Sequence, residues 1–69
     1  MSHIVQRRSD YKVVSDAVDL AEAVRVAQAK SLDLKKSHVI SYKSGAPVAY
    51  VNKLGEVTWH KQNDRELQA

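Results

Sequence analysis

Three short stretches near the end of the chain most constrain its fold. Residues 38–43, 48–52 and 56–61 are rich in the β-branched and aromatic types that favour extended strands. The two segments between them hold both glycines and the only proline, which favour tight turns. The pattern therefore predicts three consecutive antiparallel strands.

A single amphipathic helix is predicted over residues 20–31. Asp19, followed three residues later by Glu22, resembles a capping box, so the helix is expected to begin at Leu20. An earlier start at Ser15 or Asp16 stays open, because both can cap a helix. No glycine marks where the helix ends. Apolar residues recur at i, i+3, i+4 and i+7 and share one face: Leu20, Ala23, Val24 and Ala27.

The N-terminal part predicts a hairpin. Residues 2–7 alternate weakly, residues 8–10 have turn chemistry, and residues 11–18 are rich in strand-forming types. The order ββαβββ belongs to the α+β class: an antiparallel sheet of four to five strands with one helix packed on one face. We expect one domain over residues 1–61 and a flexible polar tail over residues 62–69.

Composition narrows the class of protein. A chain of 69 residues forms one domain, and without cysteine it has no disulfide, which favours the reducing cytoplasm. No stretch is apolar enough for a membrane span. The formal net charge of +3 is compatible with a polyanionic partner but is lower than dedicated nucleic-acid binders of this size usually carry.

Basic residues near the first turn and after the helix are candidates for nucleic-acid contact. Between them, an aromatic side chain of the sheet would offer a surface on which unpaired bases stack. The alternative is a solvated rim whose charges protect strand edges from aggregation. The candidates are Arg7, Arg8, Lys12, Lys35 and Lys36.

The width of the sheet suggests a second kind of surface. Five strands at about 4.8 Å spacing span roughly 24 Å, whereas a helix is about 10 Å wide. One face or edge is therefore expected to stay uncovered, apolar enough to bind a partner protein or a second copy of the chain. The alternative is a small two-sided core with a few singly exposed valines. The predicted contact residues are the aromatic anchors Tyr42, Tyr50 and Trp59 and, at the rim, Lys43, Lys53 and Lys61.

The sequence offers no catalytic constellation, so no enzymatic activity, metal or cofactor is expected. His3, His38 and His60 are too far apart for a local metal motif. His38 and His60 fall at strand ends, where we expect them to be exposed. Gly45 and Gly55 each stand alone in a turn, which gives no phosphate-binding loop.

The order of elements resembles that of certain small phage proteins. An acidic cap and an Ala-rich helix start at residues 19–24, and the strands over residues 47–59 contain a glycine turn and a tryptophan. Similar orders occur in anti-CRISPR proteins that bind the Cascade surveillance complex and in phage inhibitors of bacterial RNA polymerase. The resemblance implies a non-enzymatic inhibitor that blocks a host protein or ribonucleoprotein complex in the host cytoplasm.

A second resemblance is to mRNA-interferase toxins of the HicA type. Residues 36–43, which include Lys-Ser-His-Val, are similar to the Gly-Ser-His-His strand of that family. The second helix of the family is missing here, and an additional strand intervenes. This resemblance implies that His38 acts as general acid or base on RNA.

Overall fold

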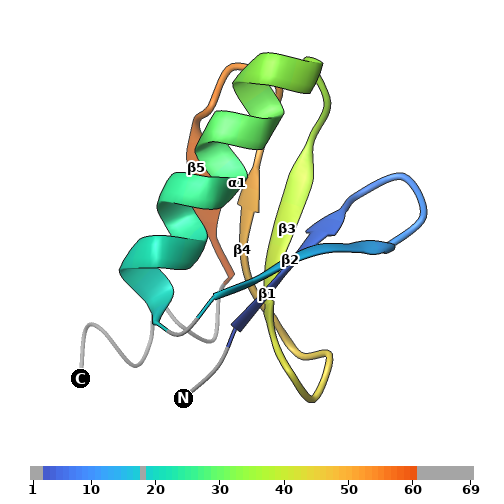
Figure 1. The fold of residues 1–69 in the computed structure, drawn as a ribbon, viewed down its shortest axis with the longest axis vertical. Helices are drawn as coiled ribbons and strands as arrows, with labels where there is room; N and C mark the ends of the chain where they lie inside the picture. Colours follow the sequence, from blue (N-terminus) through green and yellow to red (C-terminus); the bar gives the residue numbers. More distant parts are fainter. Residues whose placement is uncertain (1–2, 18, 61–69) are drawn as a thin grey trace.

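The computed structural model describes residues 3–17 and 19–60, and within them it has the predicted order of elements (Figure 1). The fold is α+β, with a five-stranded antiparallel sheet and one helix, as the sequence predicts. Val18, Lys61 and the predicted tail 62–69 lie outside the described residues. The elements are β1 (His3–Arg7), β2 (Val13–Ala17), α1 (Leu20–Leu34), β3 (His38–Tyr42), β4 (Pro47–Val51) and β5 (Val57–Trp59).

The strand order is β2-β1-β3-β4-β5, so β3 lies at the centre of the sheet. All neighbouring strands pair antiparallel. The pairing of β1 with β2 shifts between Val5 and Gln6, and that of β3 with β4 shifts between Ile40 and Ser41. These irregularities bend the sheet and decide which side chains share a face.

The strand bounds differ from the predicted ones for local reasons: β2 begins two residues later, β3 ends one residue earlier, and β4 is shifted by one residue toward the N-terminus. Strand β2 begins at Val13 because Tyr11 takes a left-handed backbone conformation, with φ at 58°. Strand β4 ends at Val51 because the Asn52 side chain organises the next turn: its Oδ1 accepts hydrogen bonds from the backbone N–H groups of Leu54 and Glu56.

The predicted start of α1 is confirmed. Asp19 has extended backbone angles, and its Oδ1 accepts a hydrogen bond of 2.8 Å from the backbone N–H of Glu22. Its carbonyl accepts from the N–H of Ala23 at 3.1 Å, which is the first helical hydrogen bond. Asp19 thus satisfies one of the free N–H groups at the helix start.

Replacing this cap is expected to weaken the fold measurably. Asp19→Ala removes the acceptor for the Glu22 N–H, and loss of such a cap typically costs about 1 kcal/mol of folding free energy. Urea unfolding followed by circular dichroism measures the change. Asp19→Asn, which keeps an acceptor oxygen, is the matched control and should lose less. Equal losses in the two variants would contradict the capping role.

The helix ends three residues later than predicted, at Leu34. Lys35 adopts the left-handed conformation (φ 56°), and its N–H and that of Lys36 donate to the carbonyl of Ser31. This is the kind of helix end that glycine usually makes. The extension places Ser31 inside the helix, where it faces the sheet and is buried.

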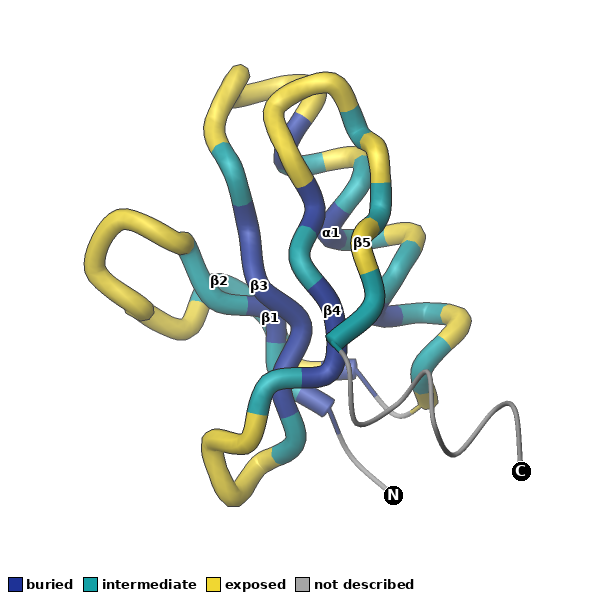
Figure 2. Tube along the Cα trace, turned by 180° about the vertical axis from the view of Figure 1, so that it is seen from behind, coloured by how far each residue is buried: buried dark blue, intermediate teal, exposed yellow. Residues whose placement is uncertain are grey.

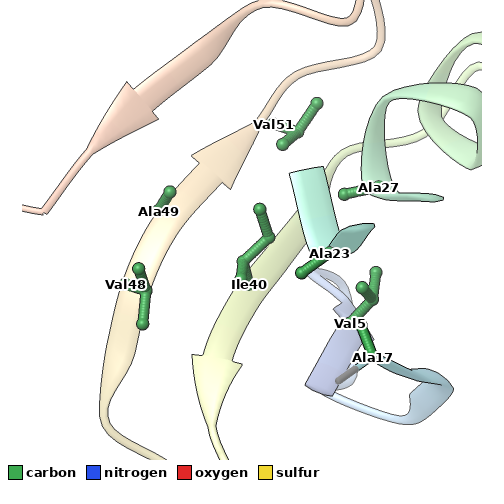
Figure 3. Close-up of a cluster of buried hydrophobic side chains, with 8 residues drawn as sticks. All are labelled: Val5, Ala17, Ala23, Ala27, Ile40, Val48, Ala49 and Val51. Atoms are coloured by element: carbon green, nitrogen blue, oxygen red, sulfur yellow. The ribbon is translucent and has the colours of Figure 1, made fainter. Parts of the chain in front are cut away.

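The core lies between α1 and the central strands (Figure 3). Ala23 and Ala27 of the helix face Val5 and Ile40 of the sheet, and their small side chains let the two layers approach closely. Half-buried Trp59 and Tyr42 pack against this cluster. The buried apolar cluster comprises Val5, Ala17, Ala23, Ala27, Ile40, Val48, Ala49 and Val51.

The opposite face of the sheet carries no helix in the described part of the chain. Figure 2 views the molecule from this side. Val39 lies there, between its cross-strand neighbours Gln6 and Tyr50, and is only 1% exposed. We call this side the helix-free face. Its side chains are mixed in polarity, and whether its apolar part binds a partner stays a prediction. The residues that the pairing places on it are Ile4, Gln6, Val13, Asp16, Val39, Ser41, Pro47, Tyr50 and Thr58.

Candidate nucleic-acid interface

Basic residues gather at one end of the sheet. Arg7, His38, Val51 and Val57 lie opposite one another in adjacent strands, so β1 and β4 end where β3 and β5 begin. Helix α1 ends there too (Figure 1). The last residue of β1 and the connections at this end carry six cationic side chains, which we call the basic end: Arg7, Arg8, Lys12, Lys35, Lys36 and Lys53.

The five basic residues predicted to contact nucleic acid all belong to the basic end. They come from the end of β1, from the connection between β1 and β2, and from the connection between α1 and β3. Lys53, predicted at the rim of a protein contact, joins them from the turn between β4 and β5. Acidic residues are also present nearby, namely Asp10, Asp33 and Glu56. The folded chain therefore concentrates charge that is spread along the sequence.

An open pocket of about 430 Å³ lies within the basic end. The backbone N–H of Arg8 donates a 3.1 Å hydrogen bond to the carbonyl of Ser37, which ties the first hairpin to the start of β3. Cationic and hydroxyl side chains from both segments surround the space, and both types donate hydrogen bonds to phosphate oxygens. The lining residues are Arg7, Arg8, Ser9, Lys36 and Ser37.

One of these cations is already paired. The guanidinium of Arg7 donates to both carboxylate oxygens of Asp10, with Nε–Oδ1 at 3.0 Å and Nη2–Oδ2 at 2.6 Å. These hydrogen bonds, with a further one from the backbone N–H of Lys12, hold the pKa of the Asp10 carboxyl well below its usual range. Arg8 and Lys36 are therefore the pocket cations that no carboxylate neutralises in the described residues.

The Arg7–Asp10 pair predicts a specific pH dependence. Because the folded-state pKa of Asp10 is lowered, the pair supports the fold above the unfolded pKa of about 3.9, and its contribution is lost as pH falls toward the folded pKa. At about pH 3, NMR should show the Asp10 carboxyl still ionised. Asp10→Asn should flatten the acid limb of the stability curve, and Asp16→Asn is the control. A normal titration of Asp10 would contradict this expectation.

Arg8 also contacts the helix-free face. Its guanidinium lies over the ring of Tyr50, with Cζ at 4.7 Å from the ring centroid. The ring of His60, the residue after β5, also lies near Tyr50, with 6.4 Å between the ring centroids. Arg8 thereby links the basic end to an aromatic side chain of the sheet, and a base can stack on either an aromatic ring or a guanidinium plane.

The three predicted aromatic anchors do not form one surface. Tyr50 lies on the helix-free face, whereas Tyr42 and Trp59 pack against the core on the side of the helix. Tyr42 is instead next to His3, with 5.3 Å between ring centroids. Lys43 lies in the exposed turn at the opposite end of the sheet. The predicted protein-contact residues are thus divided between both faces and both ends of the sheet.

His38 is not the exposed residue that its place at a strand end suggested. It is 0% exposed, and its Nδ1 lies 2.9 Å from Ser31 Oγ and 3.0 Å from the carbonyl oxygen of Lys36. A hydrogen bond to the Lys36 carbonyl requires the tautomer protonated at Nδ1, because a carbonyl only accepts. A histidine without exposed surface cannot meet an RNA strand in this conformation, so the geometry gives no support to its role as general acid or base.

The other ring nitrogen of His38 is also enclosed. Nε2 is buried and has no hydrogen-bond partner among the described residues, and the same holds for Nδ1 of His3. Over residues 3–17 and 19–60, no three His, Cys, Asp or Glu side chains come close enough to hold a metal ion. No helix in that part of the chain is both long and apolar enough to cross a bilayer.

Sequence reasoning missed the two serines of the pocket and the contact between Arg8 and Tyr50. Ser9 and Ser37 are separated by 28 positions, and only the pairing of β1 with β3 brings them together. The one available signal was the adjacency of each serine to a basic residue, Arg8 for Ser9 and Lys36 for Ser37.

No protein-family model, curated protein or solved structure matches this chain. A function for this chain is therefore inferred from the arrangement of its own side chains.

Proposed function

We propose that this protein is a small non-enzymatic binding protein whose basic end holds single-stranded nucleic acid. The observation that carries the proposal is the convergence of Arg8, Lys36 and two serine hydroxyls on one open pocket. Arg8 at the same time lies over Tyr50. A phosphate site thus lies beside a planar stacking surface, the combination by which proteins hold unpaired strands.

The charges support contact with the phosphate backbone. Lys12, Lys35 and Lys53 lie in connections at the same end of the sheet and are all exposed. Lysines of this kind release condensed counterions from nucleic acid when they bind phosphate, which provides affinity without reading sequence. We therefore propose binding with little sequence preference. The absence of cysteine accords with action in the cytoplasm.

Binding of labelled oligonucleotides tests the proposal. Fluorescence anisotropy should show that a single strand binds the full-length protein at about 20 mM salt and that affinity falls steeply toward 200 mM. With three to five phosphate contacts, log K should fall by roughly 2 to 4 per tenfold rise in salt. A duplex of the same sequence should bind more weakly, since its bases are not free to stack. No measurable binding at low salt would overturn the proposal.

A second candidate follows from the helix-free face. No helix of the described residues covers that side of the sheet, where Tyr50 and Ile4 are partly accessible and Thr58 is exposed. We propose, as the alternative, a phage or mobile-element inhibitor that places this face and the basic end against a host complex that handles nucleic acid, such as a CRISPR surveillance complex or RNA polymerase. The resemblance in element order supports this alternative.

Affinity purification distinguishes the two candidates. The tagged protein is incubated with bacterial lysate, with and without nuclease treatment, and captured proteins are identified by mass spectrometry. An inhibitor should retain one large complex after nuclease treatment. A nucleic-acid binder should lose its associated proteins when the nucleic acid is digested. Capture of no complex under either condition would contradict the inhibitor.

A further inference from the structure

The first hairpin contains an aromatic residue in a strained position. Tyr11 has φ at 58°, in the left-handed region, where a bulky side chain is rarely found. Four residues, 8–11, form the loop, in which the backbone N–H of Tyr11 donates to the carbonyl of Arg7. Glycine or asparagine normally occupies such a position, because either adopts left-handed angles at little cost. Tyrosine is thus locally unfavourable here.

Among the described residues, no contact of the Tyr11 side chain offsets that strain. The Tyr11 side chain is 56% exposed, and neither its ring nor its hydroxyl has a partner among the described residues. The recorded hydrogen bonds of Tyr11 involve only its backbone. The other non-glycine residue with positive φ, Lys35, lies at the end of α1, where that conformation terminates the helix. Backbone strain that no side-chain contact offsets is typical of functional sites.

The surrounding structure holds this conformation in place. Gln6 Nε2 donates a 3.0 Å hydrogen bond to the carbonyl of Tyr11, while Gln6 Oε1 accepts one of 2.8 Å from Ser41 Oγ. The loop backbone is therefore connected to the central strand through a side chain of the helix-free face. The backbone of Tyr11 is thus held from two sides, in an exposed loop that projects from the sheet (Figure 2).

We propose that Tyr11 stacks on an unpaired base of the nucleic acid bound at the basic end. Arg8 and Ser9, which line the pocket, belong to the same four-residue loop as Tyr11, and Lys12 follows it directly. A phosphate in the pocket would place a neighbouring base of the same strand beside the ring. An exposed ring flanked by cations suits a nucleobase with its attached phosphate better than an uncharged peptide. This inference rests on the proposed function.

Substitution at this one position should change binding and stability in opposite directions. Tyr11→Gly and Tyr11→Asn remove the ring but tolerate the left-handed backbone. They are expected to weaken binding of a single-stranded oligonucleotide roughly 5- to 150-fold, the equivalent of one lost base–aromatic stack. Their melting temperatures should be equal to or several degrees above that of the unchanged protein, because the strain is relieved.

Two further variants complete the test. Tyr11→Phe keeps the ring and should bind within about twofold of the unchanged protein, and Val13→Thr, at another exposed apolar position on the hairpin, should also bind normally. If the unchanged protein binds the oligonucleotide and Tyr11→Gly binds it equally well, the stacking role is overturned while the proposed function stands. Weaker binding with a lower melting temperature would show a structural role instead. If the unchanged protein itself does not bind at low salt, both proposals fall.

Discussion

Ile40→Ala is expected to leave the protein largely unfolded at room temperature. Ile40 is the largest of the fully buried side chains and lies on the central strand, between Val5 of β1 and Ala49 of β4. Truncating a buried isoleucine to alanine typically costs about 2–5 kcal/mol of folding free energy, because apolar burial is lost and a cavity is left behind. A domain of this size without disulfides seldom has more than about 3–5 kcal/mol of stability in total. One substitution is thus enough to remove most of it.

Urea unfolding measures this effect. Trp59 is the only tryptophan and packs against the core, so its fluorescence reports on the tertiary structure directly. Ile40→Val, which removes a single methylene group, should cost only about 0.5–1.5 kcal/mol and remain folded. Val13→Ala, at an exposed position of the edge strand β2, is the surface control. A loss below about 1 kcal/mol for Ile40→Ala would show that the core does not depend on the central strand.

Reversing two charges in the pocket is expected to remove most nucleic-acid binding. The double substitution Arg8→Glu and Lys36→Glu replaces the two pocket cations that lack a carboxylate partner. Two lost phosphate contacts should lower the steepness of log K against log salt by about 2, and affinity at low salt should fall roughly 10- to 100-fold or more. Anisotropy across a salt series gives both quantities from one experiment.

The chain provides a matched control for this double variant. Arg25 lies on the exposed side of α1, and Lys43 lies in the turn at the opposite end of the sheet. Arg25→Glu with Lys43→Glu changes the net charge by the same amount and should leave the salt dependence nearly unchanged. Equal losses for both double variants would mean that total charge governs binding and would refute a localised site. Circular dichroism should show that both variants remain folded.

The local elements could be predicted from the sequence because each depends on neighbouring residues. The spacing of Leu20, Ala23 and Ala27 indicated the helix, and Asp19 with Glu22 indicated where it begins. The end of the helix was predicted too early, because Lys35 takes a conformation that sequence patterns associate with glycine. Strand ends depended in the same way on Tyr11 and on the side-chain hydrogen bonds of Asn52.

The composition of the candidate site could be predicted only in part, because it depends on strand order and register. The sequence groups Arg7 and Arg8 with Lys36 only because all three are basic. The pairing of β1 with β3 is what places them close together. The opposite faces of Tyr42 and Tyr50 follow from the register of β3 with β4, which pairs Tyr50 with Val39, and no pattern within either strand reveals that register. The burial of His38, whose Nδ1 lies 2.9 Å from Ser31 Oγ of α1, likewise depends on how the helix packs on the sheet.

The division of charge along the molecule has a consequence for how it meets a partner. While cations dominate one end of the sheet, the opposite end of the described residues holds three carboxylates, Asp16, Asp19 and Glu22, against one cation, Lys43. The described part of the molecule therefore carries an electric dipole, and the field of a polyanion exerts a torque on it within roughly one Debye length, about 10 Å at 0.1 M salt. The molecule would then approach a polyanion with its basic end in front, so that a larger fraction of collisions would be productive.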